Sequence, residues 1–122
     1  MAHAATHSAM STEMQQCIQE CLNCHYVCLA TSHHCLAMGG RHAAPEHITL
    51  LHDCAQSCQT SADFMLRHSR LHGRACAFCA EVCRACEQSC RAMGGDDEML
   101  KQCAEACRRC AESCDRMARM AA

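Results

Sequence analysis

Apolar positions recur along this chain every three or four residues, and most of the regularly spaced ones are cysteines. The stretch CAFCAEVCRACEQSC (76–90) holds five cysteines at intervals of three, four, three and four residues. The charged residues Glu81, Arg84 and Glu87 fall between them. Because residues three and four apart share one face of an α-helix, this pattern predicts amphipathic helices that turn a line of thiols inward and their charges outward.

Helix signals divide the chain into four segments. Ser11 can cap a first helix, Pro45 suits the first turn of a second, Gly73 precedes a third, and Asp96 or Asp97 can cap a fourth. Strong helix formers dominate between these positions, and no alternating strand pattern occurs. We predict helices at about 12–38, 45–68, 74–93 and 97–117. Because the connections are short, we expect an all-α fold, an antiparallel four-helix bundle.

The chain also contains an internal repeat. The segments CLAMGG (35–40) and CRAMGG (90–95) align at an offset of 55 residues, which places three further pairs of cysteines in register. Under this offset Cys21, Cys24, Cys28 and Cys35 correspond to Cys76, Cys79, Cys83 and Cys90. The bundle is therefore predicted to be a duplicated helix-turn-helix unit. We expect one domain over residues 1–122, in which residues 1–11 form an N-terminal extension.

The amino-acid composition indicates a core with few aliphatic residues and many sulfur atoms. Leu, Ile, Val and Phe together number only fourteen, whereas the chain has sixteen cysteines and nine methionines. Both sulfur residues pack as soft hydrophobes, so a sulfur-rich interior is expected. The net charge of -2 without a basic block argues against nucleic-acid binding, and no apolar run is long enough for a membrane span. The start, MAHAATHSAMS, lacks the layout of a secretory signal, so we expect a cytoplasmic protein with reduced thiols.

The thiol lines predict a metal site rather than ordinary packing or disulfides. Leu or Ala would pack inward without the risk of oxidation, and Cβ atoms about 5 to 6 Å apart at i and i+4 are too distant for the roughly 3.8 Å of a disulfide. Two thiolates about 2.3 Å from one ion suit this spacing, and two-coordinate thiolate sites suit Cu(I) better than zinc. The candidate metal ligands are Cys17, Cys21, Cys24, Cys28, Cys35, Cys54, Cys58, Cys76, Cys79, Cys83, Cys86, Cys90, Cys103, Cys107, Cys110 and Cys114.

Thioether and imidazole groups extend these lines. In an up-down-up-down bundle, Met10, Met14, Met65, His72 and Met117 would gather at one end, where they could form a mouth for Cu(I). The opposite end also carries such groups, so the sequence leaves open which end is the mouth; they are Met38, Met93, Met99 and His47. The remaining histidines are expected to be surface or packing residues.

The Cys-x-x-x-Cys and Cys-x-x-Cys steps, repeated over nearly the whole chain, closely resemble those of the bacterial copper storage protein family. The resemblance implies a cytosolic-type bundle that stores or buffers many Cu(I) ions, or detoxifies them. It also implies a homo-oligomer, commonly a tetramer. A second apolar line at Ile18, Leu22 and Leu29 could form its interface or could equally pack between the helices. A copper chaperone is a candidate partner.

Three other functions remain as alternatives. A zinc or mixed-metal thiolate reservoir would use cysteines of facing helices in tetrahedral sites. An iron-sulfur carrier usually holds its cluster on irregular loops, often beside proline, whereas Pro45 is the only proline here. An enzyme is not expected, because no lone activated cysteine and no phosphate-binding glycine loop can be identified.

Overall fold

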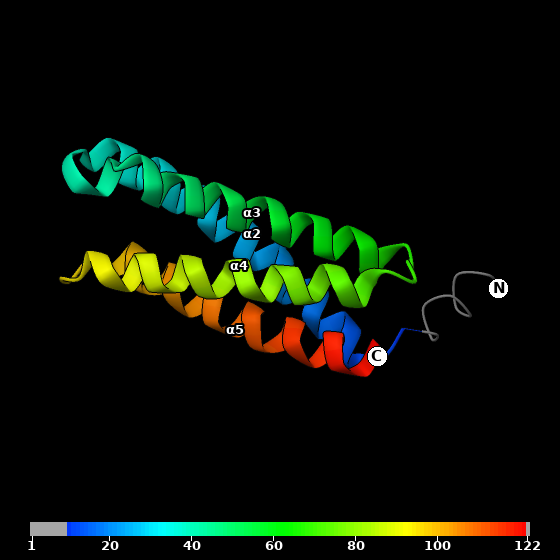
Figure 1. Ribbon diagram of the computed structural model, residues 1–122. Coiled ribbons are helices and arrows are strands. Elements are labelled where there is room, and N and C mark those ends of the chain that lie inside the picture. Colours follow the sequence, from blue (N-terminus) through cyan, green and yellow to red (C-terminus); the bar gives the residue numbers. More distant parts are fainter. Residues whose placement is uncertain (1–9, 122) are drawn as a thin grey trace.

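The computed structural model describes residues 10–121 and consists of four long helices. They are α2 (Thr12–Met38), α3 (Pro45–Leu66), α4 (His72–Met93) and α5 (Glu98–Ala121), and a short 3₁₀-helix, η1 (Gly40–Ala43), links α2 to α3 (Figure 1). No β-strand occurs between residues 10 and 121. Most of the predicted N-terminal extension, residues 1–9, lies outside this range.

The helices form a closed antiparallel bundle. Figure 1 shows successive helices running in opposite directions, with the start of α2 and the end of α5 at the same end of the molecule. Helix α2 packs against α3 and α5, and α4 packs against the same two helices. The predicted four-helix bundle is thus confirmed.

Two glycine pairs make the turns at the opposite end. Gly39 and Gly94 have nearly the same backbone conformation, with φ of 71° and 68° and ψ of -166° in both. Few residues other than glycine adopt this conformation. The repeat seen in the sequence therefore recurs as the same glycine conformation at the end of α2 and of α4, whereas of these two helices only α2 is followed by a 3₁₀-helix, η1.

The helix boundaries differ from the predicted ones at four places. Helix α3 ends at Leu66 rather than near residue 68, because His68 has a positive φ of 55°. Helix α4 begins at His72, before Gly73. A Cβ atom on Gly73 would lie 2.6 Å from the Cβ atom of Ala121, so this glycine allows close helix packing rather than ending a loop.

Helix α5 begins one residue after the predicted start at residue 97 and ends four residues after the predicted end at residue 117. Asp97 is the cap and not the first helical residue, since its Oδ1 accepts a hydrogen bond from Leu100 N at 3.0 Å. The helix continues to Ala121 because Ala118 still packs against the core and Met117 is buried.

Candidate metal centre

All sixteen cysteines point into the bundle as free thiols. Fifteen are fully buried, and Cys90 is 2% exposed. The helical period places them there, because the charged residues take the outer faces of the same helices. The predicted thiol lines thus merge into one column along the bundle axis.

The sulfurs of neighbouring helices lie in contact within this column. Sulfur-sulfur distances are 3.6 Å between Cys21 and Cys114, 3.7 Å between Cys54 and Cys83, and 3.9 Å between Cys24 and Cys107. Two thiolates on opposite sides of one ion would stand about 4.6 Å apart, taking zinc-sulfur bonds as a guide. A shift of about 1 Å or less therefore opens each contact into a metal clamp.

Several groups of four cysteines have sulfurs that all lie within 4.8 Å of one another. Two of these groups share Cys24 and Cys54, and a third shares Cys58 and Cys83 with the second. Each group draws on more than one helix. The groups overlap, so a thiolate at a shared position can bridge ions instead of serving only one.

Hydrogen bonds between the thiols lower the pKa of some cysteines and raise the pKa of others. The hydrogen bond between Cys24 and Cys107 is the largest of the contacts that lower the pKa of Cys24 below that of an ordinary thiol. The pKa of Cys107 is raised, first by its hydrogen bond with Cys103 and then by that with Cys24. Thiolates in the column are thus stabilised by neighbouring thiols, which stay protonated.

Two serines of α3 take part in this network. Ser61 Oγ lies 3.3 Å from the sulfur of Cys76, and Ser57 Oγ donates to the sulfur of Cys79 at 3.8 Å. Ser61 lies three residues after Cys58 and so continues the cysteine line of its helix. The contact of Ser57 was not anticipated, although its spacing of three residues from Cys54 places it beside the line.

The predicted mouth residues lie at one end of the bundle, where α2 begins and α5 finishes. Met65 and Met117 are buried beside the column, and Met10 and Met14 are partly buried against it. His72 is half-buried, and its Nδ1 lies 2.8 Å from the carbonyl oxygen of Ser69. A role for these five residues as copper ligands stays a prediction.

The opposite end holds a different set of polar groups. His47 is buried, with Nε2 3.5 Å from the sulfur of Cys35 and Nδ1 2.7 Å from Ser89 Oγ. Burial lowers the pKa of His47, which favours the neutral imidazole. Burial also raises the pKa of Cys35 to about 11, and the negative charge of Asp97 acts in the same direction.

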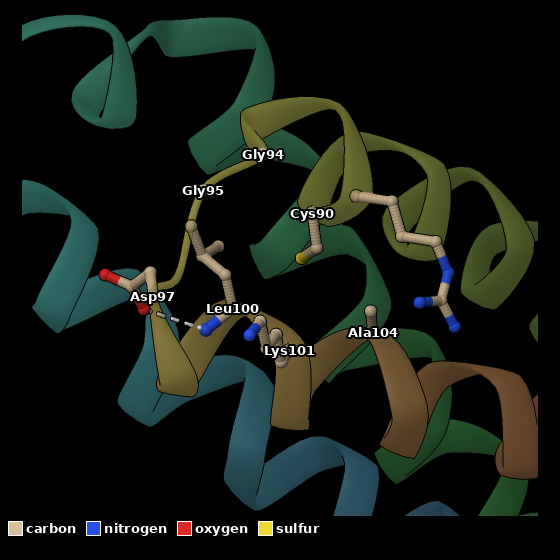
Figure 2. Close-up of a pocket in the computed structure, with 8 residues that line it drawn as sticks. Cys90, Gly94, Gly95, Asp97, Leu100, Lys101 and Ala104 are labelled. Atoms are coloured by element: carbon tan, nitrogen blue, oxygen red, sulfur yellow. Dashed lines mark hydrogen bonds between the residues drawn. The ribbon is translucent and has the colours of Figure 1, made fainter.

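A hollow of about 220 Å³ opens at this end between α4 and α5 (Figure 2). Cys90 lines it together with Leu100, Asp97 and the glycines of the second turn. Figure 2 shows the sulfur of Cys90 directed into the space between the two helices. The thiol column is therefore nearest to the surface here at Cys90.

Among the described residues, the hydrogen bonds of the other histidines are made to oxygen atoms and not to sulfur. His25 Nδ1 lies 2.7 Å from the carbonyl oxygen of Ala55, and His52 Nε2 lies 3.2 Å from Ser32 Oγ. His34 pairs with Asp97 at 2.7 Å. These contacts agree with the packing and surface roles expected for them.

Between residues 10 and 121, none of the helices has the length and apolar character that crossing a bilayer requires.

Three solved structures resemble the chain over most of its length. A protein from Nitrosospira multiformis, Nmul_A1745, is 42% identical, with a TM-score of 0.82, over 88% of this chain and 96% of that one. The Cu(I)-bound copper storage protein BsCsp3 is 32% identical, with a TM-score of 0.81, over 88% and 99%. A cytosolic copper storage protein from Streptomyces lividans, carrying five coppers, is 33% identical, with a TM-score of 0.79, over 88% and 92%.

The family model described as copper storage protein matches residues 10–119, which span all four helices and every cysteine of the column. The buried thiols and the structural neighbours agree with this match, and the chain belongs to the copper storage protein family.

Proposed function

We propose that the sixteen buried thiols of this copper storage protein are the sites that hold its Cu(I) ions. The observation that supports this best is the overlap of four-cysteine groups whose sulfurs all lie within 4.8 Å of one another. Soft thiolate ligands select Cu(I), and a two- or three-coordinate site needs no fixed tetrahedron. A column of such groups can hold several ions at once.

Charge favours shared thiolates at high loading. An ion with two private thiolates carries a net charge of -1, whereas one thiolate per ion is neutral, and uncompensated charge is costly in a buried core. Private pairs would give about eight ions for sixteen thiols, and bridging raises the capacity toward about sixteen. We expect a capacity above eight.

An anaerobic titration tests this proposal. Reduced protein would be titrated with Cu(I) in the presence of a chromophoric Cu(I) chelator, and the copper withheld from the chelator would be counted. More than eight equivalents held per chain would support the thiol column. The same titration with zinc at a comparable free concentration tests the alternative reservoir, which the comparisons do not favour. Displacement of Cu(I) by zinc under these conditions would contradict the copper assignment.

Copper is proposed to enter at the methionine end. Thioethers bind Cu(I) but have little affinity for zinc, and Met10 and Met14 lie outside the buried Met65 and Met117 at this end. His72 would add an imidazole at the rim. Replacement of Met14 and Met10 by Leu should slow loading and leave the final capacity unchanged, as measured by stopped-flow mixing with Cu(I)-chelator.

A copper chaperone is the proposed donor. Five exposed arginines surround the methionine end, and within residues 10–121 none of them forms an ion pair; they are Arg67, Arg70, Arg74, Arg116 and Arg119. A donor with an acidic face would be attracted to this end. Transfer from such a donor should slow as ionic strength rises, whereas a salt-independent rate would contradict this docking mode.

A cytoplasmic location is proposed for the protein, because thiols stay reduced there and remain able to bind Cu(I).

The proposed oligomer uses the outer face of α2. Leu29 and Leu36 are 45% and 52% exposed, Tyr26 is 74% exposed, and Leu22 continues the line at heptad spacing. Ile18, in contrast, is buried in the core and is not available. Light scattering should give a tetramer for the chain and smaller species for Leu29→Glu. A monomeric parent protein would contradict the proposal.

A further inference from the structure

Thr31 interrupts the line of thiols on α2. It lies three residues after Cys28 and four residues before Cys35, and its side chain is fully buried. Under the 55-residue offset of the repeat, Thr31 corresponds to Cys86 on α4. The chain therefore places a hydroxyl group at a core position where the other half of the repeat has a thiol.

The hydroxyl of Thr31 has no hydrogen-bond partner, and among the described residues it is the only buried side-chain nitrogen or oxygen atom in this condition. Two buried serines differ in this respect. Ser32 Oγ donates to the carbonyl oxygen of Leu29 at 2.9 Å, and Ser57 Oγ donates to that of Cys54 at 3.1 Å. A buried hydroxyl without a partner is rare in folded proteins and destabilises the metal-free bundle.

Copper binding changes the supply of hydrogen-bond donors in the column. A thiol binds Cu(I) as a thiolate, so its sulfur loses the proton and becomes an acceptor only. The neighbouring thiols that could donate to this sulfur lose their protons as well when the column fills. Hydroxyl groups keep their protons, so a hydroxyl beside the sulfurs remains a donor in the loaded protein.

Cys28 is the thiolate that Thr31 can reach on its own helix. Residues three apart are neighbours on one face, and helical side chains lean toward the N-terminus, which directs Thr31 toward Cys28. The sulfur of Cys28 lies 3.8 Å from that of Cys103, and Cys28 belongs to two of the four-cysteine groups. The sulfur of Cys35, in contrast, already has the imidazole of His47 at 3.5 Å.

We propose that Thr31 is a positioning residue for stored copper, whose hydroxyl donates a hydrogen bond to the thiolate of Cys28 once this sulfur holds Cu(I). This inference rests on the proposed storage of Cu(I) by the thiols. The hydrogen bond stabilises a buried negative sulfur and holds its orientation toward the ion. Thr31 itself binds no copper, because soft Cu(I) selects sulfur over a neutral oxygen ligand.

Thr31→Val tests the proposal, because it removes the hydroxyl and keeps the shape of the side chain. The urea midpoint of the metal-free protein should rise, since an unpaired buried hydroxyl is lost. In chelator competition, the copper capacity should stay unchanged, while about two of the ions, those that Cys28 can share, are bound about ten-fold more weakly. A residue that only packs would not produce this loss of affinity.

Two further variants separate the hydrogen bond from packing. Thr31→Ser keeps the hydroxyl and should retain the copper affinities of the parent protein. The matched control is Ser32→Ala at the neighbouring position of α2. It removes a buried hydroxyl that is bonded to a backbone carbonyl, and the copper affinities should again equal those of the parent protein.

Two results for Thr31→Val would overturn the inference: copper affinities equal to those of the parent protein, or a lower urea midpoint of the metal-free form. If Thr31→Val does not fold, a crystal structure of the copper-loaded parent protein decides. Its Thr31 Oγ1 should lie at hydrogen-bond distance from the sulfur of Cys28, and a hydroxyl that bonds elsewhere would overturn the inference. Failure of the parent protein to bind Cu(I) at all would instead overturn the storage function.

Discussion

At the scale of the residue, Cys54 of α3 contacts cysteines of all three other long helices. Its sulfur lies 3.8 Å from that of Cys24, 3.7 Å from that of Cys83 and 3.9 Å from that of Cys107. It belongs to two of the four-cysteine groups. A single thiol therefore belongs to two overlapping groups of cysteines, which neither its helix nor its spacing alone would indicate.

Replacing Cys54 by Ser should remove about two Cu(I) ions, because a bridging thiolate serves two ions. Cys17→Ser is the matched control: its sulfur contacts that of Cys114 at 3.7 Å near the end of the column, and at most one ion should be lost. Competitive Cu(I) titration of both variants gives the capacities, and circular dichroism verifies that each is folded. Equal losses from both variants would argue against bridging at Cys54.

Asp97 stabilises the start of α5 in two ways. It caps the helix through Leu100 N and pairs with His34. Asp97→Ala should lower the free energy of unfolding by about 1 kcal/mol, measured by urea denaturation of the apo protein. Asp96→Ala is the control, since its side chain is fully exposed and only approaches Lys101 at 3.9 Å.

The effect of Asp97→Ala should depend on pH in a defined direction. The hydrogen bond from His34 lowers the pKa of Asp97 below its ordinary value of 3.8. The carboxylate therefore stabilises the fold above about pH 4, and this contribution is lost as the pH falls through the lowered pKa. The parent protein and Asp97→Ala should therefore have the same free energy of unfolding at the acid end of the pH range. A difference that stays constant with pH would contradict the stabilising role of the Asp97 carboxylate.

At the scale of the element, the two glycine turns are equivalent parts of the repeat. Gly39 and Gly94 share a conformation that strains any residue with a Cβ atom, although open space surrounds both positions. Gly39→Ala and Gly94→Ala should each cost about 1 to 3 kcal/mol in the free energy of unfolding. Thermal denaturation of the two variants measures this. A stabilising effect, as expected for Gly→Ala at ordinary positions, would contradict the strain.

The sequence predicts the helices and the cysteine column well because both depend on local spacing. A period of three to four residues determines which side chains share a face, and Ser11, Pro45 and Asp97 mark helix starts. What it cannot predict depends on contacts between helices. Gly73 resembles a break in the chain, but it provides room for Ala121. His47 is one of ten histidines in the sequence, and only packing places it against Cys35.

At the scale of the whole molecule, the four long helices surround a column of buried sulfur atoms. The charged residues lie outside, where several form ion pairs along a helix, such as Arg108 with Glu105 and Glu112. Exposed pairs of this kind contribute little to stability. Most of the core is made of thiols that are also the proposed copper ligands, so packing and copper storage would depend on the same side chains.

Copper retention should weaken as the pH falls, because the thiols of the column whose pKa is raised, such as Cys107 and Cys35, bind protons in the absence of the ion. The pKa of Cys35 is raised to about 11 by burial and by the negative charge of Asp97, so this thiol is neutral at pH 7 and must lose its proton when it binds Cu(I). For each proton displaced per ion, the dissociation constant should rise about ten-fold per unit fall in pH. Chelator competition at several pH values between 6 and 8.5, corrected for protonation of the chelator, measures this slope, and circular dichroism shows that the bundle stays folded. A flat profile would mean that the sulfurs are already ionised before copper binds, which would contradict the protonated thiols inferred for the apo column.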